Sequence, residues 1–439
     1  MFKIAIVGAG PAGVSAASRL LKATANKNHD EFHVNLFDRS LVPWGLLRTG
    51  VAPDHPEVKH TAQTWSNVSD FPNFQFYGGV NISDLKKAGI KSELSLKELL
   101  DCHDSVLLCN GAYEARTLKI PGAESRRVIN AQKLVGYYNG DVMQDWDLEP
   151  AHLQGNVGII GGGNVALDVA RVLLEPALLK PSDVSAKFLE LAKEVHKISL
   201  FIRRGPFDLP CTTRELRELI HLPSVSNVII NGLDKPLGES EEYAKLMKSR
   251  KVQERKTKRL LKLLAESETD KKSESKFGKG KTVEFNFFHT PEINYESSDK
   301  ISVEFSHRGE TKRRDLSALV ESLGYEKTPV SEFITDVNLD SGKAFAFDRP
   351  IYMSGWALGG AKGVVGDSTE SSRLAVQSLF DDIENGILKS LPRKNMSSIE
   401  HSNWENWKKI DEEELRRGQE NGKQRDKILS ISEMIKITE

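Results

Sequence analysis

Two glycine-rich segments of this sequence have the residue types and the spacing that could hold the phosphates of a dinucleotide. The first is Gly8-x-Gly10-x-x-Gly13 and the second is Gly161-x-Gly163-x-x-Ala166. In such a loop the first glycine permits a tight turn, the second lets a pyrophosphate approach the backbone, and the third position lets a helix pack closely against a strand. The phosphates then meet free N–H groups at the positive end of the helix. The bare pattern is common, so its meaning depends on the elements around it.

The residues around both loops have the periodicities of a strand, a helix and a second strand. For the first loop these elements are expected at 2–7, 14–21 and 32–37, and for the second at 157–160, 167–174 and 198–202. Each segment therefore predicts a βαβ unit with the glycine loop between its first strand and its helix.

The two predicted units differ at the tip of the second strand. The first ends at Asp38, which can accept hydrogen bonds from ribose hydroxyls, whereas Arg203 and Arg204 follow the second. An acid would repel a 2′-phosphate, but paired guanidinium groups can fork onto one, so the second unit is interpreted as binding NADP. Glu215 is expected to hold one of these arginines or a ribose hydroxyl. Glycine-rich turns without a nucleotide, an exposed arginine turn and a solvated glutamate are the plain alternatives.

The distance between the two units, about 150 residues, predicts two dinucleotide domains, one inserted in the other. A strand at 105–109 would lead the chain out of the first domain, and one at 351–356 would lead it back. The expected divisions are 1–110 and 331–439 for the first domain and 111–330 for the second. The predicted fold class is thus α/β with two Rossmann-like domains. The residues from about 395 onward predict a polar, partly helical segment on the outside.

Length and composition exclude several classes of protein. The chain has 439 residues, with 61 Lys and Arg against 62 Asp and Glu. No run of about 18 apolar residues exists, which argues against a membrane span. Because a strand is expected to begin at residue 2, a transit peptide is interpreted as either already removed or never present. The three cysteines form no CxxC pair, which disfavours a disulfide scaffold, a zinc ribbon and a thioredoxin-like pair. Redox chemistry would therefore need a bound cofactor.

One basic stretch stands out in this neutral chain, within a polar region at 240–282 that predicts an exposed helix and a loop. Nine basic residues and one acid, Glu254, lie between positions 245 and 262: Lys245, Lys248, Arg250, Lys251, Arg255, Lys256, Lys258, Arg259 and Lys262. Such a field would steer an acidic protein partner. Nucleic acid is the rival partner, disfavoured because no aromatic residue interleaves with the basic ones. A solvated helix is the plain alternative.

Several motifs resemble the NADPH:adrenodoxin (ferredoxin) reductase family over nearly the whole chain. They are VPWGLLR at 42–48, GVAPDHPEVK at 50–59, GNVALDVAR at 163–171, RRGP at 203–206, ELRE at 215–218, SGW at 354–356 and RRGQ at 416–419. The resemblance implies a glutathione-reductase-like arrangement, with FAD in the outer domain and NADPH in the inserted one. It also implies hydride transfer to FAD, one-electron delivery to a 2Fe-2S ferredoxin, and a monomer in the mitochondrial matrix, with the cytoplasm as the alternative location.

The same resemblance assigns roles to individual residues. FAD contacts are expected at Gly8, Gly10, Ala12, Gly13, Asp38, Leu46, Val80, Trp356, Gly363, Val364 and Val365. NADP contacts are expected at Gly162, Gly163, Asn164, Val165, Arg203, Arg204, Glu215 and Gly363, and ferredoxin contacts at Arg255 and Arg259. Two positions depart from the family, because Asp38 replaces the usual Glu and Gly162 replaces a Gln or Asn.

His55 and Asp168 are the candidate catalytic residues, since the resemblance implies that both lie near the redox centre. A His–carboxylate pair could relay protons or hold the domains in register, and a satisfied loop histidine is the alternative. Trp356, between Gly355 and further glycines, is expected to place backbone N–H groups near the flavin, with core packing as the alternative.

Two other functions remain open at this point. One is a different FAD- and NADPH-dependent oxidoreductase, although a disulfide reductase is disfavoured by the missing cysteine pair and a glutamate-synthase-type subunit by the missing N-terminal cysteine cluster. The other is a nucleotide-binding scaffold without turnover.

Overall fold

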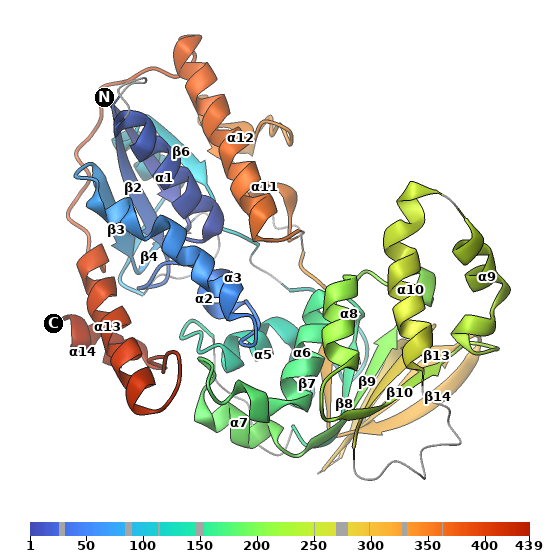
Figure 1. Cartoon of the computed structure of the whole chain (residues 1–439). Helices are drawn as coiled ribbons and strands as arrows, with labels where there is room; N and C mark the ends of the chain where they lie inside the picture. Colours follow the sequence, from blue (N-terminus) through green and yellow to red (C-terminus); the bar gives the residue numbers. More distant parts are fainter. Residues whose placement is uncertain are drawn as a thin grey trace.

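The computed structural model describes residues 1–25, 31–83, 90–112, 115–144, 153–249, 251–268, 280–297, 299–326, 332–361 and 363–439. They form two α/β units side by side (Figure 1). We call them the outer domain and the inserted domain, because the second is built from chain that lies between two parts of the first.

The outer domain is built on a seven-stranded sheet in the order β16-β17-β18-β6-β1-β2-β3. Its strands are β1 (Phe2–Val7), β2 (Phe32–Asp38), β3 (Phe74–Gly78), β6 (Ser105–Leu108), β16 (Ile334–Thr335), β17 (Lys343–Ala346) and β18 (Arg349–Met353). The last five strands in this order are parallel, and β16 and β17 add an antiparallel edge. Helices α1 (Pro11–Ala25) and α12 (Val365–Glu384) pack against each other over one face (Figure 1).

Shorter elements of the outer domain surround this sheet. They are α2 (Leu46–Thr49), α3 (Pro56–Lys59), the 3-10 helix η1 (His60–Asp70), β4 (Val80–Ile82), β5 (Ser92–Leu94), α4 (Leu96–Cys102) and α11 (Trp356–Gly359). The chain ends in α13 (Trp404–Glu420) and α14 (Ile431–Thr438).

The inserted domain is built on a six-stranded parallel sheet in the order β10-β11-β9-β8-β15-β7. Its strands are β7 (Val128–Asn130), β8 (Gly155–Ile160), β9 (Val195–Ile202), β10 (Val225–Asn231), β11 (Lys281–Phe287) and β15 (Ala318–Glu321). A three-stranded antiparallel sheet packs beside it, made of β12 (Thr290–Glu296), β13 (Ile301–His307) and β14 (Glu310–Leu316).

The helices of the inserted domain bury apolar faces in its own core. They are α5 (Ala131–Tyr138), α6 (Asn164–Leu174), α7 (Ala186–Ala192), α8 (Thr213–Ile220), α9 (Glu241–Lys248) and α10 (Arg255–Ser267), with 3-10 turns at Pro176–Leu179, Pro206–Asp208, Leu237–Glu239 and Val252–Glu254. The two parallel sheets, each with its own core, confirm the predicted fold class of two Rossmann-like domains. No helix in the described ranges is long and apolar enough to cross a membrane.

Two segments differ from expectation because apolar residues at helical spacing within them are buried. The basic stretch forms two helices rather than one exposed helix, and α10 buries Leu260, Leu261 and Leu264 in the core of the inserted domain. Arg250 and 269–279, part of the expected loop, lie outside the described residues. The C-terminal segment does not merely wrap the outside, since the core of the outer domain includes Trp404, Trp407, Ile410, Ile428 and Met434.

Candidate functional site

The first glycine loop joins β1 to α1, and its three glycines have different reasons to be glycine. Gly8 has a φ of 102°, and a Cβ there would come within 2.4 Å of the Cys109 carbonyl oxygen. A Cβ on Gly13 would come within 1.8 Å of the Gly8 carbonyl oxygen. Around Gly10, by contrast, a Cβ would meet nothing within 4 Å and φ is not positive. The fold does not require glycine at position 10, and the empty space leaves room for a close ligand.

The second loop, between β8 and α6, likewise has one glycine that the backbone requires and one beside empty space. Gly161 has a φ of 130°, and a Cβ there would lie 2.4 Å from the Ser322 carbonyl oxygen. Gly163, at the N-terminus of α6, has nothing within 4 Å of a Cβ. At Gly162 a Cβ would lie 2.8 Å from Leu209, so that side chain fills the space of the Gln or Asn expected from the resemblance. Both loops therefore fit phosphate groups at the second glycine.

Asp38 lies at the tip of β2 and is bonded to the first loop. Its carboxylate accepts hydrogen bonds from the backbone N–H of Ala9 at 2.6 Å and of Ser40 at 2.8 Å. Burial raises the pKa of the carboxyl group, although these two bonds act in the opposite direction. The residue thus ties the strand tip to the turn, and its role toward a ribose remains a prediction.

Arg203 and Arg204 follow β9, with both side chains exposed. Neither guanidinium makes an ion pair or hydrogen bond with the described part of the chain. The expectation that Glu215 holds one of them is wrong, because its carboxylate pairs with Arg171 at 3.1 Å. Helices α6 and α8 pack together, which brings Arg171 and Glu215 face to face. A ribose contact for Glu215 stays open.

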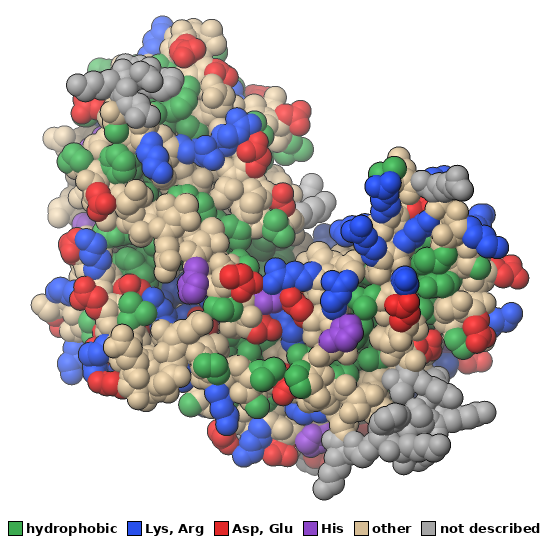
Figure 2. All heavy atoms as spheres, viewed as in Figure 1, with side chains coloured by type: hydrophobic (Ala, Val, Ile, Leu, Met, Phe, Trp, Pro, Cys, Tyr) green, Lys and Arg blue, Asp and Glu red, His purple; other side chains and the backbone are tan. Residues whose placement is uncertain are grey.

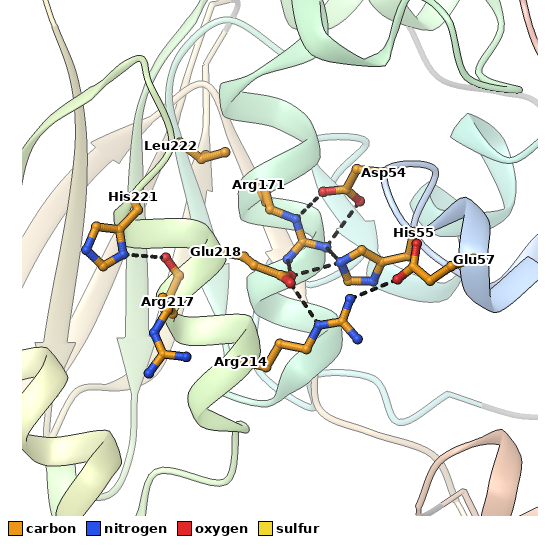
Figure 3. Close-up of a pocket in the computed structure, with 9 residues that line it drawn as sticks. All are labelled: Asp54, His55, Glu57, Arg171, Arg214, Arg217, Glu218, His221 and Leu222. Atoms are coloured by element: carbon orange, nitrogen blue, oxygen red, sulfur yellow. Dashed lines mark hydrogen bonds and ion pairs between the residues drawn. The ribbon is translucent and has the colours of Figure 1, made fainter.

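Arg171 is the centre of a charge cluster between the two domains (Figure 3). Its side chain is 3% exposed and contacts Asp54 of the outer domain through two nitrogens. Within the inserted domain it contacts Asp168 at 2.9 Å, Glu215 at 3.1 Å and Glu218 at 3.6 Å. Sequence reasoning missed this residue, although an arginine inside the otherwise apolar run from 169 to 174 was a signal.

His55 and Asp168 belong to this cluster but do not touch. His55 Nε2 lies 2.8 Å from Glu218 Oε2 and 3.4 Å from Arg171 Nη2, so Arg171 stands between the two candidates. Burial, together with the nearby carboxyl group of Glu215, raises the pKa of Asp168 to about 8, against the effect of Arg171. The predicted His55–Asp168 pair is therefore not a direct contact, because Arg171 connects the two residues.

An open cavity of about 690 Å³ lies on the solvent side of this cluster (Figure 3). Arg214 on its wall contacts Glu57 of the outer domain at 2.9 Å and Glu218 at 2.8 Å. The segment 54–57 therefore contributes three polar side-chain contacts to the inserted domain.

The remaining residues expected at cofactors fall into two groups. Ala12 and Val80 are buried, whereas Leu46, Val165 and Val364 expose 38%, 37% and 64% of their surface. These three lie in or next to the first turns of α2, α6 and α12, where exposed apolar side chains fit contact with a cofactor. Asn164, at the start of α6, is bonded within the domain, its Oδ1 accepting from Thr212 N at 2.8 Å.

The loop after β18 contains a half-buried tryptophan. Gly355 has a φ of 63° and precedes α11, which begins at Trp356. The Trp356 ring lies 5.6 Å from the ring of Tyr325, in the chain that returns from the inserted domain. Further on, Gly363 and Val365 stand at the start of α12, where Gly363 has a φ of 83°. The tryptophan is thus half-buried against Tyr325, and both core packing and a flavin contact stay open.

Arg255 and Arg259 lie on α10, exposed and without an ion pair in the described residues. Figure 2 shows basic side chains gathered over α10, beside the hollow between the two domains. The surface is thus positively charged, as expected from the sequence.

Comparison with known proteins gives consistent results. The family model for pyridine nucleotide-disulphide oxidoreductases matches residues 2–222. The chain is 32% identical to NADPH:adrenodoxin oxidoreductase, mitochondrial, of Bos taurus and 31% identical to that of Homo sapiens, over 99% of this chain and 92% and 91% of those proteins. Mycobacterium tuberculosis FprA in complex with NADPH superposes with a TM-score of 0.82 at 26% identity, covering 100% of this chain and 99% of that one.

Proposed function

Because the chain belongs to the pyridine nucleotide-disulphide oxidoreductases and, among them, to the NADPH:adrenodoxin oxidoreductase family, we propose that it passes electrons from NADPH to a 2Fe-2S ferredoxin of the adrenodoxin type. It is an oxidoreductase that uses FAD and NADP(H).

The outer domain would hold FAD. The space at Gly10 accommodates a pyrophosphate, and the remaining lone pairs of Asp38 are available to a ribose hydroxyl. Leu46, Val80, Trp356 and 363–365 would line the ring system. FAD, when bound, accepts a hydride from NADPH and passes its electrons on one at a time.

The inserted domain would hold NADPH, and one observation carries this assignment. Two exposed, unpaired guanidinium groups stand at the tip of β9, where the outer domain has a carboxylate instead. A 2′-phosphate supplies the negative charge that they lack. The space at Gly163 would accommodate the pyrophosphate, with Gly162, Asn164 and Val165 beside it. Glu215, on the first turn of α8, is the proposed ribose contact.

His55 and Asp168 would act through Arg171. The guanidinium keeps Asp54, Asp168 and Glu218 in one cluster, so it fixes the segment that carries His55 against α6 and α8. Burial and the nearby carboxyl group of Glu215 raise the pKa of Asp168 against the effect of Arg171, so this carboxyl group is the proposed place for a proton inside the cluster. The residues would thus both align the domains and store a proton.

Arg255 and Arg259 would contact the ferredoxin. Unpaired cations on an exposed helix face favour an acidic protein surface and raise the association rate. The relatives are named mitochondrial, so the mitochondrial matrix is the proposed location.

The test is a pair of reactions with the purified flavoprotein. Anaerobic NADPH should bleach the flavin absorbance, and the reduced protein should then support cytochrome c reduction only when an acidic 2Fe-2S ferredoxin is added. A flavin that NADPH does not bleach would refute the NADPH assignment. Bleaching without transfer to any 2Fe-2S ferredoxin, with ferricyanide still reduced, would refute the partner.

A further inference from the structure

The loop between α13 and α14, residues 421–430, joins the outer domain to the inserted domain, and we call it the C-terminal bridge. Its Ile428 belongs to the core of the outer domain. Gln424 N, however, donates to Pro181 O at 2.9 Å, and Lys423 Nζ donates to Val184 O at 3.0 Å. Both acceptors belong to the inserted domain. The bridge therefore contacts the inserted domain through residues other than those where the chain crosses between the domains.

Lys427 is the buried centre of this bridge. Its ammonium lies 2.7 Å from Asp183 Oδ2 and donates to Asn139 O at 2.8 Å, both in the inserted domain. It also donates to Arg48 O, in the outer domain, at 2.8 Å. Three acceptors around Nζ match the three N–H groups of an ammonium. Methionine could fill the same volume but could not hold three acceptors from two domains.

The surroundings show that this ammonium is not placed for stability alone. Lys59 Nζ lies 2.7 Å from the same Asp183 carboxylate and donates to Asn139 Oδ1 at 2.9 Å, so two buried ammonium groups share one carboxylate. Burial, with Lys59 and Arg48 nearby, lowers the pKa of Lys427 to about 7 even though Asp183 acts in the opposite direction. Buried charges of this kind contribute little net stability and are better explained by the geometry they specify.

The outer-domain end of the contact lies beside an expected flavin contact. Arg48 is the third residue of α2, which begins at Leu46. Its guanidinium forms a two-pronged pair with Glu414 of α13, at 2.8 Å and 2.5 Å. The C-terminal segment thus holds α2 at two points of Arg48. Glu414 pairs with its guanidinium, and Lys427 donates to its backbone carbonyl oxygen. The same ammonium holds the end of α5 in the inserted domain.

We propose that Lys427 is a positioning residue for hydride transfer: it fixes the end of α5 relative to α2, and so sets how closely a nicotinamide held by the inserted domain approaches a flavin held by the outer domain. This inference rests on the proposed function. The Lys427 side chain is 2% exposed and its ammonium is surrounded by acceptors of the protein, so the residue would act only through the orientation of the two domains.

The test compares Lys427→Met with Lys343→Met. Lys343 also forms a pair with a buried carboxylate, Asp382, at 2.7 Å, but entirely within the outer domain. Stopped-flow reduction by NADPH gives the limiting rate constant and the NADPH dissociation constant separately, and no ferredoxin is needed. Lys427→Met should lower the rate constant at least tenfold with FAD content and NADPH affinity within twofold of wild type. Lys343→Met should leave all three within twofold.

A second measurement does not depend on turnover. Hydrogen exchange of the backbone at 181–184 and 139–140 should quicken in Lys427→Met and stay unchanged in Lys343→Met. If Lys427→Met does not accumulate as a flavoprotein, Asp183→Asn, which keeps the shape of the site, takes its place with the same expectations. A rate constant within twofold of wild type in a folded variant, or an equal fall in Lys343→Met, overturns the proposal. Failure of wild type to bleach with NADPH would instead refute the proposed function.

Discussion

The two glycine loops have the same backbone arrangement, but the charged side chain beside the first loop is hydrogen-bonded by the protein, whereas those beside the second loop are not. In the outer domain the carboxylate of Asp38 is buried and already bonded to two backbone N–H groups of its own loop. In the inserted domain Arg203 and Arg204 are exposed and bonded to nothing in the described residues. A group satisfied by the protein is suited to a resident cofactor, while unsatisfied cations are suited to a charged molecule that arrives and leaves. The difference supports the proposed assignment of FAD to the outer domain and of NADPH to the inserted domain.

The largest expected effect comes from placing a side chain at Gly10 or at Gly163, where the structure leaves empty space. Gly10→Val should abolish FAD binding and leave a folded, colourless protein, because a Cβ at position 10 meets no protein atom but occupies the place of the pyrophosphate. Gly163→Val should keep the yellow flavin and lose reduction by NADPH. Absorbance spectra, circular dichroism and anaerobic NADPH titration measure these outcomes. Equal loss of flavin in both variants would show that the loops are not specialised.

Removing the two arginines should weaken NADPH selectively. Charge-assisted hydrogen bonds contribute about 1.5–3 kcal/mol each, so Arg203→Ala with Arg204→Ala should weaken NADPH by roughly a hundredfold or more. NADH lacks the 2′-phosphate, so its dissociation constant should change only a few-fold, and FAD content should not change. Fluorescence titrations with both nucleotides provide the measurement. A similar loss for NADPH and NADH would contradict the assignment of the 2′-phosphate.

The contrast between Asp38 and the two arginines could be predicted from the sequence, because each side of it depends on residues that lie close together in the chain. A strand, a glycine loop and a strand tip span about 40 residues, and local periodicity predicts where Asp38 and Arg203 must stand. The partners of Arg171 were not predictable in this way. Asp54 lies 117 residues from it, and only the contacts of the segment 54–57 with side chains of α6 and α8 bring the two together. Lys427 is further still from its partners, and a lone lysine in a polar stretch carries no signal of burial.

Unpaired arginines elsewhere in the inserted domain should affect a different step. Arg255→Glu with Arg259→Glu should raise the ferredoxin KM about tenfold and flatten its dependence on salt, since exposed charges act mainly on association and are screened over about 8 Å at physiological ionic strength. Flavin reduction and ferricyanide activity should be normal. Cytochrome c reduction over a salt series, measured together with ferricyanide reduction, separates an effect on ferredoxin association from an effect on flavin reduction. A parallel fall in both activities would mean that α10 is needed for the fold.

The smallest expected effect concerns the stability of the outer loop without its cofactor. Burial raises the pKa of Asp38 above the unfolded value, so the folded apoprotein binds this proton more tightly than the unfolded chain does. The contribution of Asp38 to stability is therefore fully present at a pH below the unfolded pKa of about 3.9 and declines as pH rises through the folded pKa. Against Asp38→Asn, which cannot titrate, wild-type apoprotein should lose its relative advantage in Tm as the pH rises from 4 to 7. A relative advantage that grows with pH would show that the two amide bonds outweigh burial, and that the carboxylate is held charged before FAD arrives.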